Sequence, residues 1–292
     1  MIILEGRLNM NKGFLLYNQK DYVKNKWFAD EFIKNAPYFQ MEIKLLLTEQ
    51  LIIGTAYGNV FAEYNGERLE TPKFVINRSR NAMLGFHFEL MGSKVFNSSK
   101  VTDICNHKGK THQLINSHGI PSVKTIIPLE NQSITTAHAW NFPIIVKSTS
   151  GHGGNEVFLV NNQEQLNHHL SQMNNDVIIQ EMCTNPGIDI RVFVMGNEVI
   201  GAVKRFSNNS FKSNVTLGGH SEKYTLTSEE HRLVKRMMTL LDFDFVGIDF
   251  ILDENEQFLF NEIEDVVGTR TLYKHYEIDV VQTYLKYIKK QL

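Results

Sequence analysis

The fold is decided by one stretch of the chain, FVGIDFILDENEQFLFNEIEDVVG, which spans residues 245 to 268. Its two apolar runs, 245–252 and 257–264, predict β-strands that are joined by the turn DENE. Asp249 lies among apolar residues of the first run, which is typical of a strand buried on both faces. A buried carboxylate needs a partner, so we expect a second charged group beside it.

Three acidic residues follow in the second run and its end: Glu262, Glu264 and Asp265. Because side chains alternate along a strand, Glu262 and Glu264 should point to one face, toward Asp249, with Asp265 on the other face or in the turn. Carboxylates this close repel unless a cation lies between them, and Mg²⁺ prefers oxygen ligands of this kind. The alternative is a solvated face of an edge strand.

A second cue is a lysine followed by a glycine-bearing loop. Lys147 ends the predicted strand 142–148, and the loop SGHGG covers 150–154. Glycines let backbone N–H groups approach phosphate oxygens, and a lysine adds a point charge. The spacing is not GxxxxGK[ST], so it predicts no P-loop of that kind. On its own, a surface turn after a core strand is the simpler explanation.

A third cue is a set of cations: Lys108, Arg191, Lys204, Arg205 and Lys212. Each one alone is typical of a solvated surface charge. Arg191 and Arg205, however, lie on the two arms of a predicted hairpin, and Arg205 precedes a polar, glycine-bearing segment that predicts a mobile loop.

The order of predicted elements indicates an α/β protein. Strands and helices alternate in the first third, which favours a small open α/β domain with a mainly parallel sheet. No GxGxxG follows its first strand, which argues against a dinucleotide site. The expected elements there are strands 13–17, 41–47, 74–79 and 94–97 and helices 25–36 and 81–92. Beyond them we expect helices 108–119, 163–173, 228–241 and one from about 279, strands 142–148, 157–160 and 177–182, the hairpin 189–206 and a loop over 208–223.

Composition excludes several functional classes. The chain has 292 residues, a formal net charge of -2 and only two cysteines, without CxxC spacing. These values argue against a nucleic-acid or membrane-surface binder, a disulfide framework and a zinc site. We see neither a signal peptide nor an apolar run long enough to span a membrane, so we expect a cytoplasmic protein.

Four stretches carry a family resemblance by their content and order. They are FVINRSRNAMLGFHFELMGSKVFNSSKVTDICNHKGKTHQLINSHGIP (74–121), FPIIVKSTSGHGGNEVFLV (142–160), IIQEMCTNPGIDIRVFVMGNEVIGAVKRFSNNSFKSNVTLGGH (178–220) and FVGIDFI…FLFNEIE (245–264). Over about residues 74 to 270 the sequence resembles the ATP-grasp superfamily. Within it, the sequence is most similar to the RimK-type carboxylate–amine ligases, which add amino acids to a carboxyl terminus or a carrier protein.

The resemblance implies a fold and a division of the chain. It implies a small N-terminal α/β pre-ATP-grasp domain over 1–97, followed by a two-lobed α+β ATP-grasp domain with the nucleotide between its lobes. The small lobe should cover 98–182 and the C-terminal lobe 183–292. Residues 1–73 match the family only in general shape.

The resemblance also implies roles for individual residues. The two nucleotide-binding lysines correspond to Lys108 and Lys147. A phosphate-covering flap corresponds to Ser150, Gly151, Gly153 and Gly154, the adenine-binding strand to Gln180, Glu181, Met182 and Cys183, and a ribose-binding carboxylate to Asp189. The basic pair near the γ-phosphate and acceptor carboxylate corresponds to Arg191 and Arg205, and the loop asparagine of this subgroup to Asn214. The three metal-ligand positions are Asp249, Glu262 and Glu264.

These roles imply an ADP-forming ligase that uses ATP and Mg²⁺, with two ions expected and Mn²⁺ as a substitute. The γ-phosphoryl group would pass to a small-molecule or peptide carboxylate, and an amino acid or other amine would attack the acyl phosphate. Alternatives are a glutathione-synthetase-like or dipeptide ligase, a ligase of precursor peptides, and an inactive ATP-binding regulatory module. The oligomeric state is left open, and a homo-oligomer is one alternative because many relatives self-associate.

Two departures from the family pattern concern the substrate side. The third metal ligand is usually asparagine, whereas here it is Glu264, which predicts tighter divalent-metal binding or a weaker pull on the phosphates. The turn that normally borders the acceptor pocket reads Asp265-Val266-Val267-Gly268. Arg270 just beyond it is expected either to contact a substrate carboxylate or to form a salt bridge with Asp265.

Overall fold

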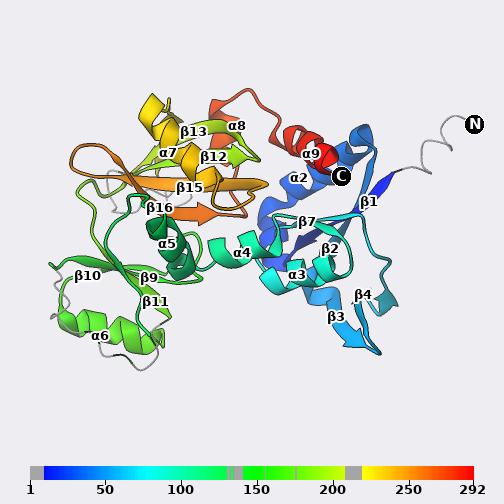
Figure 1. Cartoon of the computed structure of the whole chain (residues 1–292), viewed down its shortest axis with the longest axis horizontal. Coiled ribbons are helices and arrows are strands. Elements are labelled where there is room, and N and C mark those ends of the chain that lie inside the picture. The colour runs from blue at the N-terminus through cyan, green and yellow to red at the C-terminus, as the bar shows by residue number, and fades with distance from the viewer. Residues whose placement is uncertain are drawn as a thin grey trace, which may run out of the picture.

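The computed structural model describes residues 10–129, 132, 134, 141–154, 156–174, 176–207 and 219–292. The described chain forms four sheets with helices packed against them, which confirms the predicted α/β class (Figure 1). The predicted loop over 208–223 lies largely outside the described residues. Its last part does not fit the prediction, because His220–Lys223 forms strand β14 and pairs with the strand before it.

The N-terminal sheet is parallel, as predicted, in the order β2-β1-β6-β7. Leu15 and Tyr17 enter the core on one face of the sheet, whereas Phe14 and Leu16 enter the core on the other. Burial on both faces is what parallel strands require. The strands are β1 (Asn11–Tyr17), β2 (Met41–Leu47), β6 (Phe74–Asn77) and β7 (Lys94–Phe96), and the helices are α2 (Gln19–Asn35) and α3 (Ala82–Leu90), with short 3₁₀ turns η1 (Ala36–Phe39) and η2 (Thr48–Gln50).

A small antiparallel sheet, β3-β4-β5, has no counterpart in the prediction. It comprises β3 (Leu51–Ala56), β4 (Asn59–Tyr64) and β5 (Glu67–Arg68). Ala62 and Ile53 pack against the same core as α3. Figure 1 shows this hairpin extending from the N-terminal part of the molecule.

The small lobe is an antiparallel sheet in the order β10-β9-β11-β8, with one helix on it. Its elements are β8 (Thr125–Ile126), β9 (Ile144–Ser148), β10 (Val157–Val160), β11 (Val177–Glu181) and α6 (Gln163–Gln172). The helices α4 (Ser99–Cys105) and α5 (Lys108–Ser117) connect this lobe to the N-terminal part (Figure 1).

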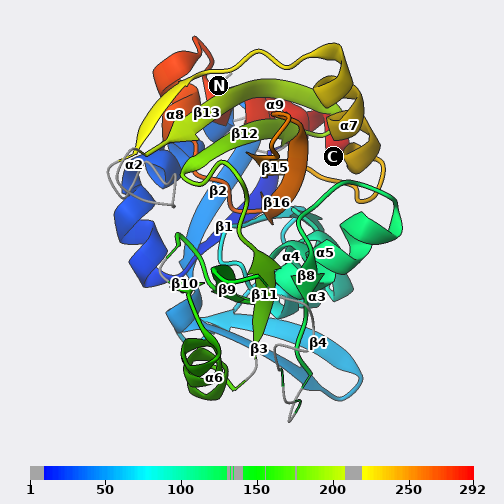
Figure 2. The same cartoon turned by 90° about the vertical axis from the view of Figure 1, so that its left-hand side faces the viewer.

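The largest sheet is antiparallel in the order β14-β13-β12-β15-β16. Its strands are β12 (Ile188–Met195), β13 (Glu198–Phe206), β14, β15 (Phe245–Leu252) and β16 (Phe258–Glu264). Helix α7 (Ser228–Met238) packs on one face, and α8 (Arg270–His275), which was not predicted, and α9 (Val280–Gln291) pack on the other. Figure 2 shows this sheet above the small lobe.

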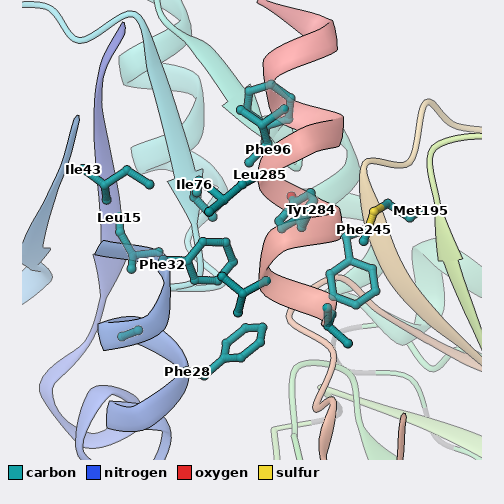
Figure 3. Packing of buried hydrophobic residues seen from close by; sticks show 14 of the residues in the cluster. Leu15, Phe28, Phe32, Ile43, Ile76, Phe96, Met195, Phe245, Tyr284 and Leu285 are labelled. Atoms are coloured by element: carbon teal, nitrogen blue, oxygen red, sulfur yellow. The ribbon is translucent and has the colours of Figure 1, made fainter. Parts of the chain in front are cut away.

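Helix α9 joins the two ends of the chain in one core. Figure 3 shows Tyr284 and Leu285 of α9 between Phe32 of α2 and Phe245 of β15. The last helix therefore packs on the N-terminal sheet as well as on the large sheet, and it fixes the position of the N-terminal elements relative to the site. The three domain boundaries stay predictions. Within the described parts of the chain, no helix is both long and apolar enough to cross a membrane.

Candidate active site

The structure brings Asp249, Glu262 and Glu264 together at neighbouring strands β15 and β16. One carboxylate oxygen of each lies within 4.8 Å of the others. Asp249 is buried and pairs directly with Glu262 across the two strands, while Gly247 pairs with Glu264. The alternation of β16 thus places the two glutamates on the face of Asp249, as predicted. Three hard oxygen donors at this separation fit Mg²⁺.

A β-bulge adds a residue that the alternation did not predict. Asp249 pairs with Glu262 but the next residue, Phe250, pairs with Phe260, so Asn261 is the extra residue of β16. Asn261 and Glu262 consequently line the same cavity. The Asn261 side-chain oxygen accepts a hydrogen bond of 2.7 Å from Nζ of Lys147. Bulges of this kind re-aim side chains next to active sites.

Two buried arginines link the acids into one network. Arg191 binds Asp249 through two hydrogen bonds, Nε to Oδ1 at 2.8 Å and Nη2 to Oδ2 at 2.7 Å. The same Nη2 lies 2.7 Å from Oε1 of Glu264. Arg205 binds Asp189 through two hydrogen bonds of 2.6 and 2.7 Å and reaches Asp249 at 2.8 Å. Bidentate guanidinium–carboxylate pairs fix the orientation of both partners.

The strand register explains why these pairs form. Asp189 lies opposite Arg205 in the β12–β13 pair, and Arg191 lies opposite Asp249 in the β12–β15 pair. Burial alone raises the pKa of Asp249, but the two guanidinium groups outweigh it and hold that pKa at about 2. Asp249 is therefore ionised at any ordinary pH and can serve as an oxygen ligand.

Two lysines approach the acids from the small-lobe side. Lys108 is the first residue of α5 and is buried; its Nζ donates to the Gly151 carbonyl at 2.6 Å and lies 2.9 Å from Oε1 of Glu262. Burial, together with the charge of Lys108, lowers the pKa of Lys147 to about 8, against the opposing effect of Glu262. Both ammonium groups therefore contact residues of β16, Lys108 at Glu262 and Lys147 at Asn261.

A buried, neutral histidine beside the two lysines was not predicted. His112 lies one helical turn after Lys108, and its Nε2 is 3.2 Å from the Asn261 carbonyl and 3.0 Å from Nε2 of Gln180. Burial and the charges of Lys147 and Lys108 lower the pKa of His112 to about 3. The sequence contained a signal for it, because residues four apart in a helix lie on the same face and His112 lies four residues after Lys108.

The residues of the predicted adenine strand lie between the two lobes. Glu181, Met182 and Cys183 line a cavity between the small lobe and the large sheet, which is described below. Gln180 also lines it, but its side chain points inward and donates to Thr125 at 2.9 Å. Main-chain groups and the side chains after Gln180 are thus the ones that can face a ligand.

One cavity lies between the small lobe and the large sheet. It is bounded by Lys108, Lys147, Asp189, Asp249, Asn261, Glu262 and Glu264 as well as the adenine-strand residues. Gly151, Gly153 and Gly154 also line it, and the last two have φ of +67° and +77°, which glycine adopts readily. Ser150 is exposed and lines neither this cavity nor the next. Asn214 lies outside the described residues.

A second cavity, of about 370 Å³, adjoins the first. It shares Lys108, Gly153, Glu262 and Glu264 with the first cavity, and Arg191 and Arg205 line this one. The turn 265–268 also lines it. The expected salt bridge between Arg270 and Asp265 does not form among the described residues: Asp265 is buried, whereas Nη2 of exposed Arg270 donates to the Lys24 carbonyl at 3.2 Å.

Comparison with known proteins agrees with this geometry. Residues 105–288 match the RimK-like ATP-grasp domain. The chain is 26% identical to Uncharacterized protein MG011 of Mycoplasma genitalium over 98% of each chain. It is 28% identical to human N-acetylaspartylglutamate synthase A over 82% of this chain and 66% of the relative.

A solved structure gives the same fold at lower identity. The ATP-grasp ligase PsnB, complexed with a phosphomimetic variant of its minimal precursor, Mg and ADP, superimposes with a TM-score of 0.70 and 14% identity, covering 97% of this chain and 99% of PsnB. The family match covers well over half of the 292 residues. The chain belongs to the RimK-like family of ATP-grasp ligases.

Proposed function

We propose that this protein is an ATP-dependent carboxylate–amine ligase, which forms an amide bond through an acyl phosphate and releases ADP and phosphate. The observation that carries the proposal is the pair of adjoining cavities, which share Lys108, Glu262 and Glu264. A nucleotide in the first cavity and a carboxylate in the second would meet over these shared residues. Direct phosphoryl transfer needs such a meeting, with donor and acceptor oxygens held in line.

The first cavity has the groups that a nucleotide needs. Lys108 and Lys147 are cations of its lining, and Gly151, Gly153 and Gly154 let the backbone approach phosphate oxygens. Glu181 to Cys183 offer main-chain groups for adenine. Asp189 lines the same cavity and holds Arg205 through two hydrogen bonds, and we propose it as the contact of a ribose hydroxyl.

Asp249, Glu262 and Glu264 are the residues that would hold Mg²⁺, or Mn²⁺ in its place. When bound, one or two such ions supply positive charge that offsets the phosphate oxygens during transfer. Arg191 supports this set, because it fixes the orientation of Asp249 and Glu264 at 2.7–2.8 Å.

We propose that Arg191 and Arg205 serve the acceptor half of the reaction. Both line the second cavity next to the acid cluster. Charge builds on the transferred phosphoryl oxygens and then on the tetrahedral oxyanion that the amine creates, and fixed guanidinium donors stabilise both. We assign the oxyanion to Arg205 and propose Asn214, which lies outside the described residues, as a further polar contact.

The pairing of charges supports a turnover-competent site rather than a degenerate one. Lys108, Lys147, Arg191 and Arg205 each contact an oxygen of the acid cluster or of Asn261 or Asp189. Bound ligands could replace these internal ion pairs, because phosphates would bind the cations and a metal ion would bind the carboxylates.

The test is a phosphate-release screen with MgATP in which carboxylates and amino acids are varied in pairs. Phosphate release that requires both members of a pair supports the ligase. If ADP binds but no pair releases phosphate above the rate with MgATP alone, the ligase proposal is wrong and the chain is a nucleotide-binding module.

A further inference from the structure

The side chain of Asn97 joins the N-terminal elements to the strands that carry the acid cluster. Asn97 follows β7, is 3% exposed and lines neither cavity. Its Oδ1 accepts hydrogen bonds from the main-chain N–H groups of Asp244 at 2.8 Å and Phe245 at 3.1 Å. Its Nδ2 donates to the carbonyls of Phe245 at 2.9 Å and Asp265 at 3.0 Å. An asparagine amide has two donor hydrogens and two acceptor lone pairs, so its full bonding capacity is used.

These bonds lie where the ladder between β15 and β16 ends. The last pair of that ladder is Gly247 with Glu264, and β16 stops at Glu264. Phe245 is the first residue of β15, before Gly247, and Asp265 follows Glu264 directly. The Asn97 amide nitrogen therefore bridges the two strands just beyond their own pairing. Strand ends open more readily than strand centres, so this bridge holds the chain beside Glu264 in place.

The turn after β16 is held on two further sides. Nη2 of Arg78, which directly follows β6, donates to the Val267 carbonyl at 3.2 Å. A Cβ atom at Gly247 would lie 2.5 Å from Cγ2 of Val267, so only glycine lets the turn pack this closely on β15. Val267 is fully buried there. The turn is thus fixed by residues of the N-terminal elements as well as by β15.

Glu264 is the acid whose position depends most on this bridge. Asp249 lies inside β15 and is buried. Glu262 lies two residues before the end of β16 and pairs with Asp249. Glu264 is the last residue of β16, and its side chain is 30% exposed. Its place therefore depends on what holds the chain just beyond it, which is the bond from Asn97 to the Asp265 carbonyl.

We propose that Asn97 is a positioning residue of the metal site: by tying the ends of β15 and β16 together, it holds Glu264 at the distance from Asp249 that a divalent ion requires. The proposal rests on the proposed function, to which the ion belongs. Asn97 lines neither cavity, so it acts through the main chain beside Glu264. The N-terminal sheet thereby controls the geometry of a site that is built on another sheet.

The first experiment measures metal binding without turnover. Protein saturated with ADP is titrated with Mg²⁺ by calorimetry, for the wild type, Asn97→Ala and Ser93→Ala. Ser93→Ala is the matched control, because it also removes a buried side-chain bond to the main chain, from Oγ to the Pro72 carbonyl at 2.8 Å, but within the N-terminal part.

We expect Mg²⁺ affinity to fall about 10- to 100-fold in Asn97→Ala, as is typical when a group that orients a metal ligand is removed. The control should bind Mg²⁺ like the wild type. A purely structural role of Asn97 would lower the thermal stability of the variant but leave the Mg²⁺ affinity of the folded protein unchanged. Wild-type Mg²⁺ affinity in folded Asn97→Ala therefore overturns the proposal.

The second experiment uses the wild type alone and decides if Asn97→Ala does not fold. Nuclear magnetic resonance follows the side-chain amide of Asn97 while Mg²⁺ is added to the ADP-saturated protein. The side-chain amide of Asn35, which is also buried and donates to the Glu31 carbonyl at 2.9 Å in helix α2, is the internal control. We expect the Asn97 resonances to shift with Mg²⁺ and those of Asn35 to stay. Asn97 resonances that do not respond contradict the assignment.

Turnover separates this proposal from the ligase function. If Mg²⁺ binding depends on Asn97 but no pair of carboxylate and amine elicits phosphate release, the positioning role stands and the ligase function fails. If phosphate release requires both substrates, and folded Asn97→Ala binds Mg²⁺ and turns over like the wild type, the ligase function stands and the positioning role fails. If the wild type binds no Mg²⁺, both fail.

Discussion

Glu264→Asn tests the charge of the proposed metal site, because the family resemblance implies asparagine at this position. In the structure Glu264 lies 2.7 Å from Arg191 and within 4.8 Å of the other two acids. The substitution keeps an oxygen ligand and removes one negative charge. We expect Mg²⁺ to bind more weakly to the variant than to the wild type.

The magnitude follows from Coulomb's law. Two unit charges about 4 Å apart interact by about 1 kcal/mol in water and about 4 kcal/mol at an effective dielectric constant of 20. The attraction of a divalent ion to Glu264 is twice the energy of one pair of unit charges. If binding the ion draws Glu264 away from Arg191, the energy of one such pair is lost. The Glu264 side chain is 30% exposed, so the net effect lies between these limits. About 1–4 kcal/mol corresponds to roughly a 5- to 1000-fold change in affinity.

The assay is a calorimetric titration of Mg²⁺ into protein with saturating ADP, at low and at moderate salt. The difference from the wild type should shrink as salt rises, because screening weakens partly exposed charges. Glu254→Gln removes an exposed charge from the turn at the far end of the same hairpin and should leave the affinity unchanged. If Glu264→Asn binds Mg²⁺ as tightly as the wild type, or more tightly, the charge argument is wrong.

Three further predictions concern the buried charges. Asp249→Asn and Glu262→Gln should each abolish phosphate release while ADP still binds, and turnover in both would contradict the metal assignment. Because the pKa of Lys147 is about 8, ADP affinity measured by calorimetry should fall as pH rises above 8 in the wild type but stay level in Lys147→Arg, and equal pH profiles would refute this. Burial raises the pKa of Asp244 from 3.8 to about 7 against the hydrogen bond from Tyr287, so its contribution to stability is complete below pH 3.8 and lost as pH rises through 7. Denaturant unfolding should therefore find Asp244→Asn more stable than the wild type at pH 8, by up to about 4 kcal/mol, and a variant that is less stable there would overturn the sign.

The acid cluster could be predicted because it depends on a short-range rule. Strand alternation alone places Glu262 and Glu264 on one face, and the apolar neighbours of Asp249 indicate its burial. The pairings of Arg191 and Arg205 needed the register between strands. That register depends on hairpin geometry and on contacts far apart in the sequence, which periodicity does not report.

Features that break a period could not be predicted in the same way. The bulge at Asn261 reverses the expected face of one residue, and only a polar side chain at a core-facing position hinted at it. The predicted helix began at residue 25, whereas α2 begins at Gln19 and has a break in its helical geometry at Asn25. The sheet β3-β4-β5 is short and partly exposed, and it lacks the strong alternation of the core strands.

Arg78 illustrates a different limit. In the sequence it is one arginine among the 30 lysines and arginines of the chain, and a solvated surface position is the ordinary expectation. Its burial arises only when β6, α2 and the turn after β16 meet around it. Tertiary packing, which has no local signature, decides which cations become buried.

The buried ionic network contributes less to the stability of the fold than apolar residues could, so stability alone does not account for it. Asp189, Arg205, Arg191 and Asp249 form a connected set on three adjacent strands, all of them less than 7% exposed. Well-packed apolar residues in such positions are often as stabilising as buried ion pairs or more so, whereas removal of one partner destabilises by about 3–5 kcal/mol. A fold selected only for stability has little reason to keep four such charges. Their presence fits the proposed site, which must present fixed cations and ionised carboxylates to phosphate and metal, and it predicts that neutralising a whole pair harms the fold less than neutralising one member.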